Sequence, residues 1–320
     1  MRFKQLLHAF SLSITLIAAT AAPAQRLFVT NEKDGTVSVI DTRTNKVATT
    51  IPVGQRPRGI GFSPDRNALY VAVSKDNAIA VVDPKSFKVL RTIPAGSDPE
   101  AFAIHSNGNI YIANEDDAKA TAIDPRTGEK LVEIPVGLEP EGVAVSPDGS
   151  LVVVTSESSN MVHVIQVPEH KIIANIPVGA RPREAVFTAN GRRAYVTSEV
   201  SGEVSEIDMK NFNILQRASL REKVKKAKPK GILLSKDEKT LYVSLGRAAK
   251  VVVLDAETLQ IKETIPVGKR VWGLALTRDG GRLYTADGAD NQVSVIDTTR
   301  NEVVETITVG KSPWGIVIDD

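Results

Sequence analysis

The chain has 320 residues, with 40 lysines and arginines against 38 aspartates and glutamates, a formal net charge of +2 and no cysteine. The lack of cysteine excludes disulfide bonds, covalently attached haem of the c type and thiolate metal sites. The near balance of charge gives no reason to expect nucleic acid or an acidic membrane surface as a partner. The chain is long enough to be stabilised by packing alone.

The first predicted element is a secretory leader. Two basic residues precede an apolar run over residues 6–19, and Ala22-Pro23-Ala24 supplies the small residues of a cleavage site. This order is typical of a signal peptide, and the run is too short for a membrane span. We therefore predict a signal peptide at residues 1–24, one domain at residues 25–320 and a periplasmic or secreted protein. An uncleaved N-terminal anchor is the alternative.

A repeated unit of about 42 residues occupies the rest of the chain. Its second strand carries one recurring four-residue word, found at Phe28–Asn31, Tyr70–Val73, Tyr111–Asn114, Val153–Ser156, Tyr195–Ser198, Tyr242–Leu245 and Tyr284–Asp287. The steps between these words are 42, 41, 42, 42, 47 and 42 residues. A fixed period in this range with several short strands per unit predicts a β-propeller with one blade per repeat.

The unit that follows Arg56 predicts the structure of one blade. Four runs rich in β-branched and aromatic residues, at 57–62, 69–73, 78–83 and 88–94, are separated by Pro, Gly, Asn and Asp clusters, which is the pattern of an antiparallel meander. The mature chain starts at a second strand and ends with a lone first strand. We therefore predict an all-β, seven-bladed propeller of four-stranded blades, closed by a blade built from both termini.

The start of each first strand is the most variable part of the repeat, and it lies at one end of the predicted channel, called the top here. The pattern x-Pro-x-Gly places one residue on each side of a proline. These pairs are Arg56 and Arg58, Asp98 and Glu100, Glu139 and Glu141, Arg181 and Arg183, Lys228 and Lys230, Arg270 and Trp272 (with Val271 for proline), and Ser312 and Trp314.

Two interpretations of this mouth stay open. The first is a ligand pocket, in which the tryptophans offer flat apolar surface and the arginines and lysines bind carboxylates. The predicted ligand-binding residues are Arg56, Arg58, Glu100, Glu141, Arg183, Lys230, Arg270, Trp272 and Trp314. The second is a neutralised rim, in which Arg58 and Arg183 pair with Glu100 and Glu141.

Two further features belong to the same end. The carboxylates after the second strands could hold Ca²⁺ through oxygen ligands or be solvated loop charges, and we assign no metal site to them; they are Glu32, Glu115, Glu157, Glu199 and Asp287. The fifth repeat carries a basic insertion at Leu220–Lys228, which is a lid, a docking contact or a plain solvated loop.

The sequence carries no catalytic signature. It contains no nucleophile elbow, phosphate-binding loop or dinucleotide fingerprint. The histidines of the mature chain, His105, His163 and His170, fall at different repeat positions, so we predict no shared metal cluster. We expect a binding protein and no enzymatic activity.

The words Phe28–Asn31, Val39–Asp41 and Ile51–Gly54 resemble the YVTN β-propeller repeat, and the resemblance extends over the mature chain. A closer similarity is to the seven-repeat β-propeller proteins associated with catabolism that depends on pyrroloquinoline quinone (PQQ). It is carried by Gly54–Gly59, Ile112–Asp117, Glu139–Gly142, Arg270–Trp272 and Pro313–Gly315. The resemblance implies an exported accessory protein of PQQ-dependent alcohol oxidation and transport. Its partner would be a small acidic or aromatic molecule, PQQ among them, or a periplasmic oxidation or transport protein.

Two other functions remain as alternatives. One is a propeller hydrolase of the lactonase type, using a metal or the carboxylates Glu100, Glu141 and Glu184 at the mouth. Glu184 stands where most repeats have glycine, which places a charge close to the channel wall. The other is a structural ring that docks proteins through its tryptophans.

Overall fold

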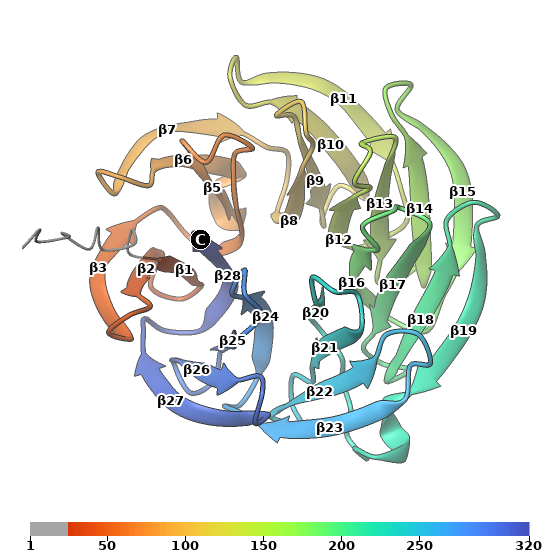
Figure 1. The fold of residues 1–320 in the computed structure, drawn as a ribbon. Coiled ribbons are helices and arrows are strands. Elements are labelled where there is room, and N and C mark those ends of the chain that lie inside the picture. Colours follow the sequence, from red (N-terminus) through yellow and green to blue (C-terminus); the bar gives the residue numbers. More distant parts are fainter. Residues whose placement is uncertain (1–24, 320) are drawn as a thin grey trace, which may run out of the picture.

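The computed structural model describes residues 25–319, so the predicted leader lies outside the described residues. These residues form seven four-stranded antiparallel sheets around a central channel (Figure 1). The seven-bladed propeller predicted from the repeat is confirmed. No helix in the described part of the chain is both long and apolar enough to cross a membrane.

Each blade has four strands, which lie side by side from the channel to the perimeter. The innermost strands are β4 (Pro57–Phe62), β8 (Pro99–Ile104), β12 (Pro140–Val145), β16 (Pro182–Phe187), β20 (Ile232–Leu234), β24 (Val271–Leu276) and β28 (Pro313–Asp319). The second strands are β1 (Arg26–Asn31), β5 (Leu69–Val73), β9 (Ile110–Asn114), β13 (Leu151–Ser156), β17 (Arg193–Ser198), β21 (Thr240–Ser244) and β25 (Arg282–Asp287). The third strands are β2 (Thr36–Asp41), β6 (Ala78–Asp83), β10 (Lys119–Asp124), β14 (Met161–Gln166), β18 (Glu203–Asp208), β22 (Lys250–Asp255) and β26 (Gln292–Asp297). The outer strands are β3 (Lys46–Pro52), β7 (Lys88–Pro94), β11 (Glu129–Pro135), β15 (Lys171–Pro177), β19 (Asn213–Ser219), β23 (Ile261–Pro266) and β27 (Glu302–Thr308). Two single 3₁₀ turns, η1 (Ser74–Asp76) and η2 (Leu220–Glu222), complete the elements.

The ring is closed by a sheet that contains both ends of the domain. Its strand order is β28-β1-β2-β3, and the register of β1 on β28 pairs Leu27 with Ile318 and Phe28 with Val317. The last strand therefore supplies the innermost position that the first repeat lacks, as the sequence predicted. Closure removes an open edge that would otherwise offer unpaired N–H and C=O groups.

The core lies between the blades rather than inside one of them. Phe28 and Val39 of the closing blade pack in one cluster with Val71 and Val82 of the next blade, and the other clusters bridge neighbouring blades in the same way. The second and third strands are consequently buried on both faces. Because burying one large apolar side chain contributes about 1.5–3 kcal/mol, an incomplete ring would lose the contacts on two sheet faces.

Two local features direct variable side chains to the top of the channel. The residue before the proline takes a left-handed backbone, as in Arg56 (φ 57°) and Arg181 (φ 61°). Past the proline, glycine permits close contact between neighbouring first strands, since a Cβ on Gly142 would overlap the carbonyl oxygen of Arg183 in the next blade. Seven such strand starts therefore converge on one mouth.

Candidate functional site

The residues after the prolines form an inner ring around the mouth of the channel: Arg58, Glu100, Glu141, Arg183, Lys230, Trp272 and Trp314. Its five charged members are buried, with at most 8% of the residue surface exposed. The residues before the prolines, including Arg56 and Arg270, stand around it. The structure thus brings all nine predicted ligand-binding residues to one end of the channel. Whether they bind a ligand stays a prediction.

Arg183 is the centre of one buried charge network. Its guanidinium group lies 2.9 Å from the carboxylate of Glu141 and 2.6 Å from that of Glu199, and it also contacts Glu157. Lys230 lies 2.6 Å from the same Glu199 carboxylate. These contacts join three neighbouring blades, and they explain why so many charges remain buried together.

Arg58 organises the opposite side of the mouth. It contacts Glu100 and lies 3.0 Å from Glu32, while Arg56 lies 3.1 Å from Glu100. The pairs Arg58–Glu100 and Arg183–Glu141 are those of the neutralised-rim interpretation. The geometry therefore leaves these arginines little freedom to bind a ligand, and any ligand charge has to be matched by other cations.

The buried networks shift the pKa values of their members in opposite directions. Burial opposes the charge of Glu199, but the nearby Arg183 and Lys230 outweigh burial and lower the pKa of Glu199 to about 2. Burial and the charge of Glu141 raise the pKa of Glu157 to about 8. Burial and the neighbouring Arg183 lower the pKa of Lys230 to about 8. The mouth therefore contains groups that exchange protons near neutral pH.

The two tryptophans stack on each other. Their ring centroids are 5.5 Å apart with an interplanar angle of 27°, and the Lys230 ammonium group lies 4.0 Å from the Trp272 ring centroid. A flat ligand placed between the rings would need them about 7 Å apart, since each carbon contact takes about 3.5 Å. The pair therefore forms a floor at the mouth, with no space for a ligand ring between the two indoles.

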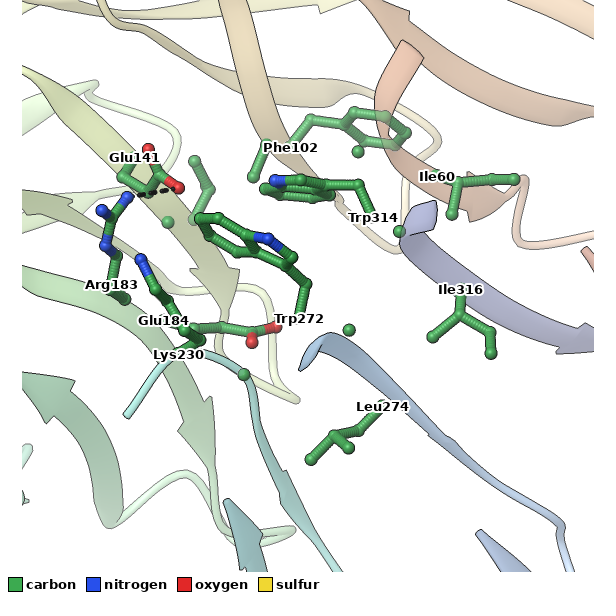
Figure 2. A pocket seen from close by; sticks show the side chains of 17 residues that line it. Ile60, Phe102, Glu141, Arg183, Glu184, Lys230, Trp272, Leu274, Trp314 and Ile316 are labelled. Atoms are coloured by element: carbon green, nitrogen blue, oxygen red, sulfur yellow. Dashed lines mark ion pairs between the residues drawn. The ribbon is translucent and has the colours of Figure 1, made fainter. Parts of the chain in front are cut away.

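Two adjoining cavities meet at this floor, where Trp272 lines both and Trp314 lines only the lower one. A funnel of about 560 Å³ opens above it, and a smaller cavity of about 140 Å³ lies in the channel below (Figure 2). Glu141, Arg183, Lys230 and Trp272 line both cavities. The walls of the lower cavity are mixed, with apolar side chains such as Phe102 beside the charged groups. Polar groups of the funnel thus continue into the upper part of the channel at the tryptophan floor.

Four ionisable side chains line the lower cavity. Glu141, Arg183 and Lys230 also line the funnel, and Glu184 lines the lower cavity alone. One carboxylate oxygen accepts a hydrogen bond from the backbone N–H of Ile232 at 3.1 Å, and no ion pair engages the carboxylate within residues 25–319. The side chain is exposed within the channel, but the protein atoms crowded around it desolvate its carboxylate and raise its pKa to about 7. Figure 2 shows its carboxyl group near Trp272.

The next blade makes room for this glutamate. At the equivalent position the other repeats have five glycines and one alanine, because neighbouring first strands are in close contact there. The strand that faces Glu184, β20, has only three residues and starts at Ile232. Its first N–H is free to bind the carboxylate, so the irregular fifth repeat admits a side chain where the others exclude one.

The funnel has cations without close carboxylates on one side. Arg247 has no carboxylate within ion-pair distance in the described part of the chain. Lys269 lies 4.0 Å from Asp290, and Arg270 lies 3.6 Å from Glu32. Arg247 and Lys269 are exposed. An anionic ligand would therefore bind on this side of the funnel. Sequence analysis predicted neither residue as a ligand contact, although both lie in loops that it placed at the top: Arg247 follows a second strand and Lys269 precedes a first strand.

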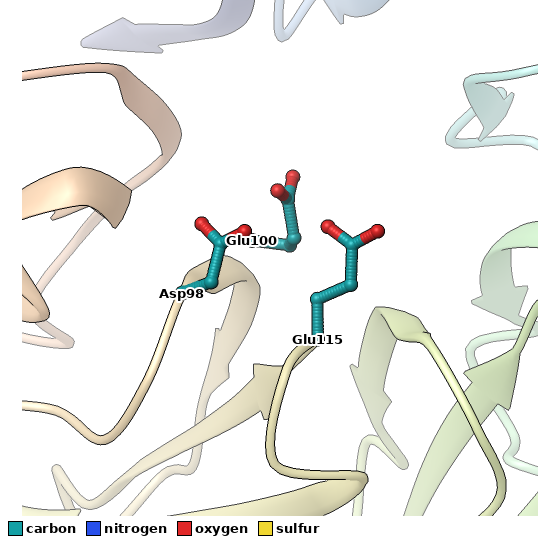
Figure 3. Close-up of side chains that lie close together, drawn as sticks. All are labelled: Asp98, Glu100 and Glu115. Carbon is teal, nitrogen blue, oxygen red and sulfur yellow. The ribbon is translucent and has the colours of Figure 1, made fainter.

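Three carboxylates meet on the opposite side. Asp98, Glu100 and Glu115 place oxygens within 4.8 Å of one another (Figure 3), and we call them the acidic cluster. Arg56 lies 2.7 Å from Asp98 and 3.1 Å from Glu100, so guanidinium groups already balance much of its charge. Binding of Ca²⁺ stays a prediction.

The other carboxylates predicted on this face have varied roles. Glu157 and Glu199 are buried partners of Arg183, and sequence reasoning took them for loop charges. Asp287 is buried and accepts hydrogen bonds from the Ser294 hydroxyl at 2.6 Å and the Gly268 N–H at 3.2 Å. It connects strands within one blade and does not reach the mouth as a ligand.

These features define a seven-bladed β-propeller with a charged funnel above a closed channel. Residues 168–304 match a family model described as a seven-bladed β-propeller lactonase, and residues 6–117 match a YNCE-like β-propeller model. Neither match spans half of the chain. No curated protein matches the sequence. The PQQ-associated family suggested by the sequence is not confirmed by these matches.

Solved structures show the same fold. A candidate 6-phosphogluconolactonase from Bacteroides uniformis has a TM-score of 0.78 at 18% identity, covering 93% of this chain and 100% of its own. The periplasmic gluconolactonase of Pseudomonas aeruginosa has a TM-score of 0.77 at 21% identity, covering 92% and 99%. A protein of unknown function from Desulfotomaculum acetoxidans has a TM-score of 0.80 at 16% identity, covering 92% and 98%. At these identities the likeness establishes the fold.

The expectation that the protein is not an enzyme is wrong. The match of residues 168–304 to a family model described as a seven-bladed β-propeller lactonase contradicts it. The absence of linear catalytic motifs in the sequence led to the wrong expectation about activity. A carboxylate that becomes a base through its surroundings in a channel leaves no such motif.

Proposed function

We propose that the protein hydrolyses a lactone that carries an anionic group, and that the reaction takes place at the tryptophan floor. The observation that carries the proposal is Glu184, a carboxylate with no ion-pair partner in residues 25–319 and a pKa raised to about 7. A general base works best when its pKa lies near the working pH. Glu100 and Glu141, the other carboxylates suspected from the sequence, are engaged by arginines.

The proposed chemistry requires one water molecule and one lactone. The Glu184 carboxylate accepts a proton from water as the water oxygen bonds to the lactone carbonyl carbon. Negative charge then develops on the carbonyl oxygen, and the ammonium group of Lys230, which lines the same cavity, stabilises it. The ring C–O bond breaks, the leaving oxygen takes the proton back from Glu184, and the product is a hydroxy acid.

The distribution of charge supports an anionic substrate. Arg247, Lys269 and Arg270 hold no carboxylate closer than 3.6 Å, so a phosphate or carboxylate on the lactone would neutralise them. Two of the similar structures are named as a candidate lactonase of a phosphorylated gluconolactone and a lactonase of a non-phosphorylated one. We favour the phosphorylated class for this chain because of these open cations.

The experiment is a proton-release assay on glucono-1,5-lactone and its 6-phosphate, corrected for spontaneous hydrolysis. We expect faster turnover of the phosphorylated lactone and a loss of about 10²–10⁴ in kcat for Glu184→Gln. Glu129→Gln, at an exposed glutamate on an outer strand, is the matched control and should keep wild-type activity. No lactonase activity on either substrate, or full activity in Glu184→Gln, contradicts the proposal.

The accessory role in PQQ-dependent catabolism has less support, because the stacked indole rings leave no space for a planar quinone between them. Export to the periplasm remains part of the proposal. A periplasmic lactonase of the same fold is compatible with it.

A further inference from the structure

The loop between β19 and β20 departs from the sevenfold repeat. It spans residues 220–231, twelve residues where the corresponding loops of the other six blades have four. It begins at the perimeter, where Figure 1 shows a short helical turn next to the end of β19, and it ends at Lys230 of the inner ring. One loop thus connects the outer edge of the molecule with the mouth.

Apolar anchors fix the shape of this loop. Leu220, Val224 and Ala227 are buried. They pack with Leu245 in the core cluster between the blade of β16–β19 and the blade of β20–β23. Backbone hydrogen bonds run from the Val224 N–H to the Leu220 carbonyl at 2.9 Å and from the Ala227 N–H to the Val224 carbonyl at 2.8 Å. The residues between the anchors must therefore face solvent.

Those outward residues are cations. Arg221, Lys223, Lys225 and Lys226 are all exposed, and we call them the basic platform. No carboxylate of residues 25–319 pairs with its three lysines, and Glu222 is the single acid among them. The excess is local, because the whole chain has a formal charge of only +2. Four cations with Glu222 as the one acid among them leave a local excess of positive charge on a nearly neutral molecule.

We propose that the basic platform is a docking surface for an acidic protein segment rich in aspartate and glutamate. This goes beyond the proposed hydrolysis and does not depend on it. Charge complementarity supports this proposal, because carboxylates of a partner would form the ion pairs that the three lysines lack within residues 25–319. The exposed Val200, whose carbonyl oxygen is held by Arg221, offers adjoining apolar contact.

Other polyanions fit this surface less well. Every apolar side chain of the segment 220–227 is buried, so none is available to insert into a membrane interface. The platform has no aromatic side chain on which a nucleic-acid base could stack, and lysines outnumber arginine three to one. Lysine acts as a hydrated point charge, whereas bidentate phosphate recognition favours arginine. A flexible run of carboxylates suits spaced lysines.

The test uses the mature protein and a fluorescein-labelled decaglutamate peptide, with binding followed by anisotropy at about 25 and about 250 mM salt. We expect saturable binding whose Kd rises at least about tenfold at the higher salt. The variant K223E/K225E/K226E should weaken binding about tenfold or more. The control K46E/K88E/K171E makes the same change in net charge at exposed outer-strand lysines and should bind like the wild type.

Each other outcome overturns the proposal. Equal loss in both triple variants would show that net charge, not the platform, drives binding. Tighter, platform-dependent binding to heparin or to phosphatidylglycerol vesicles than to the peptide would assign the surface to a polysaccharide or a membrane. No salt-dependent binding to decaglutamate would remove the docking surface. Lactone hydrolysis by K223E/K225E/K226E should equal the wild type, which keeps this result separate from the proposed function.

Discussion

Replacing Arg183 by methionine tests whether the mouth is a desolvated charge network. Methionine keeps much of the side-chain volume and removes the charge. Of the three carboxylates around Arg183, Glu157 keeps its contact with Arg181, and Glu199 keeps Lys230 at 2.6 Å. Glu141 makes no other ion pair in the described chain and is 5% exposed. One buried carboxylate is therefore left without a partner, and breaking a buried pair in this way costs about 3–5 kcal/mol.

The assay is urea denaturation at several pH values. Burial opposes the charge of Glu141, but the attraction of Arg183, Arg58 and Lys230 together outweighs burial and holds its folded pKa below the ordinary value of 4.5. Its pairing therefore stabilises the fold above that value, and the stabilisation is lost as pH falls through the lowered folded pKa. The deficit of Arg183→Met should be largest near neutral pH and shrink below about pH 4.5.

The double variant Glu141→Gln/Arg183→Met is the control, because it removes the orphaned charge and should recover most of the loss. A cost below about 1 kcal/mol for Arg183→Met, the size seen for exposed pairs, would refute the reasoning. So would a deficit that does not depend on pH.

Three other predictions concern the same end of the channel. If Glu184 is the base, kcat/KM should rise with pH and level off above about pH 7, with about 10% of the maximum left at pH 6; a profile flat from pH 5 to 9 excludes it. Because burial raises the folded pKa of Glu184, its ionisation destabilises the fold as pH rises from the pKa of the unfolded chain towards 7. Scanning calorimetry should therefore show that Glu184→Gln is more stable than the wild type at pH 8 but not at pH 4. Since Arg56 already balances the acidic cluster, chelation should leave lactone hydrolysis unchanged, and a loss reversed by Ca²⁺ would instead place a metal at Asp98, Glu100 and Glu115.

Much of the site could be located from the sequence because it follows from the repeat. Residues flanking equivalent prolines must occupy equivalent places in seven blades, so Arg58, Arg183 and Trp272 were predicted to share one mouth. What each does there depends on partners from other repeats. Glu157 and Glu199 looked like loop charges until Arg183 was seen between them. The cations Arg247 and Lys269 lie in the predicted top loops, but only the structure shows that they lack a close carboxylate in the described chain.

The sequence by itself determined the seven blades, the closure by both termini and the end of the channel at which variable residues gather. These follow from short-range patterns that recur at a fixed period, since each blade folds on the same local rules. Only the tertiary structure decided that the tryptophans stack, that Arg58 and Arg183 are saturated by carboxylates, and that Glu184 stays unpaired in the channel. Those properties depend on distances of a few ångströms between segments that lie tens of residues apart, and on the removal of water from charges that the closed ring brings together.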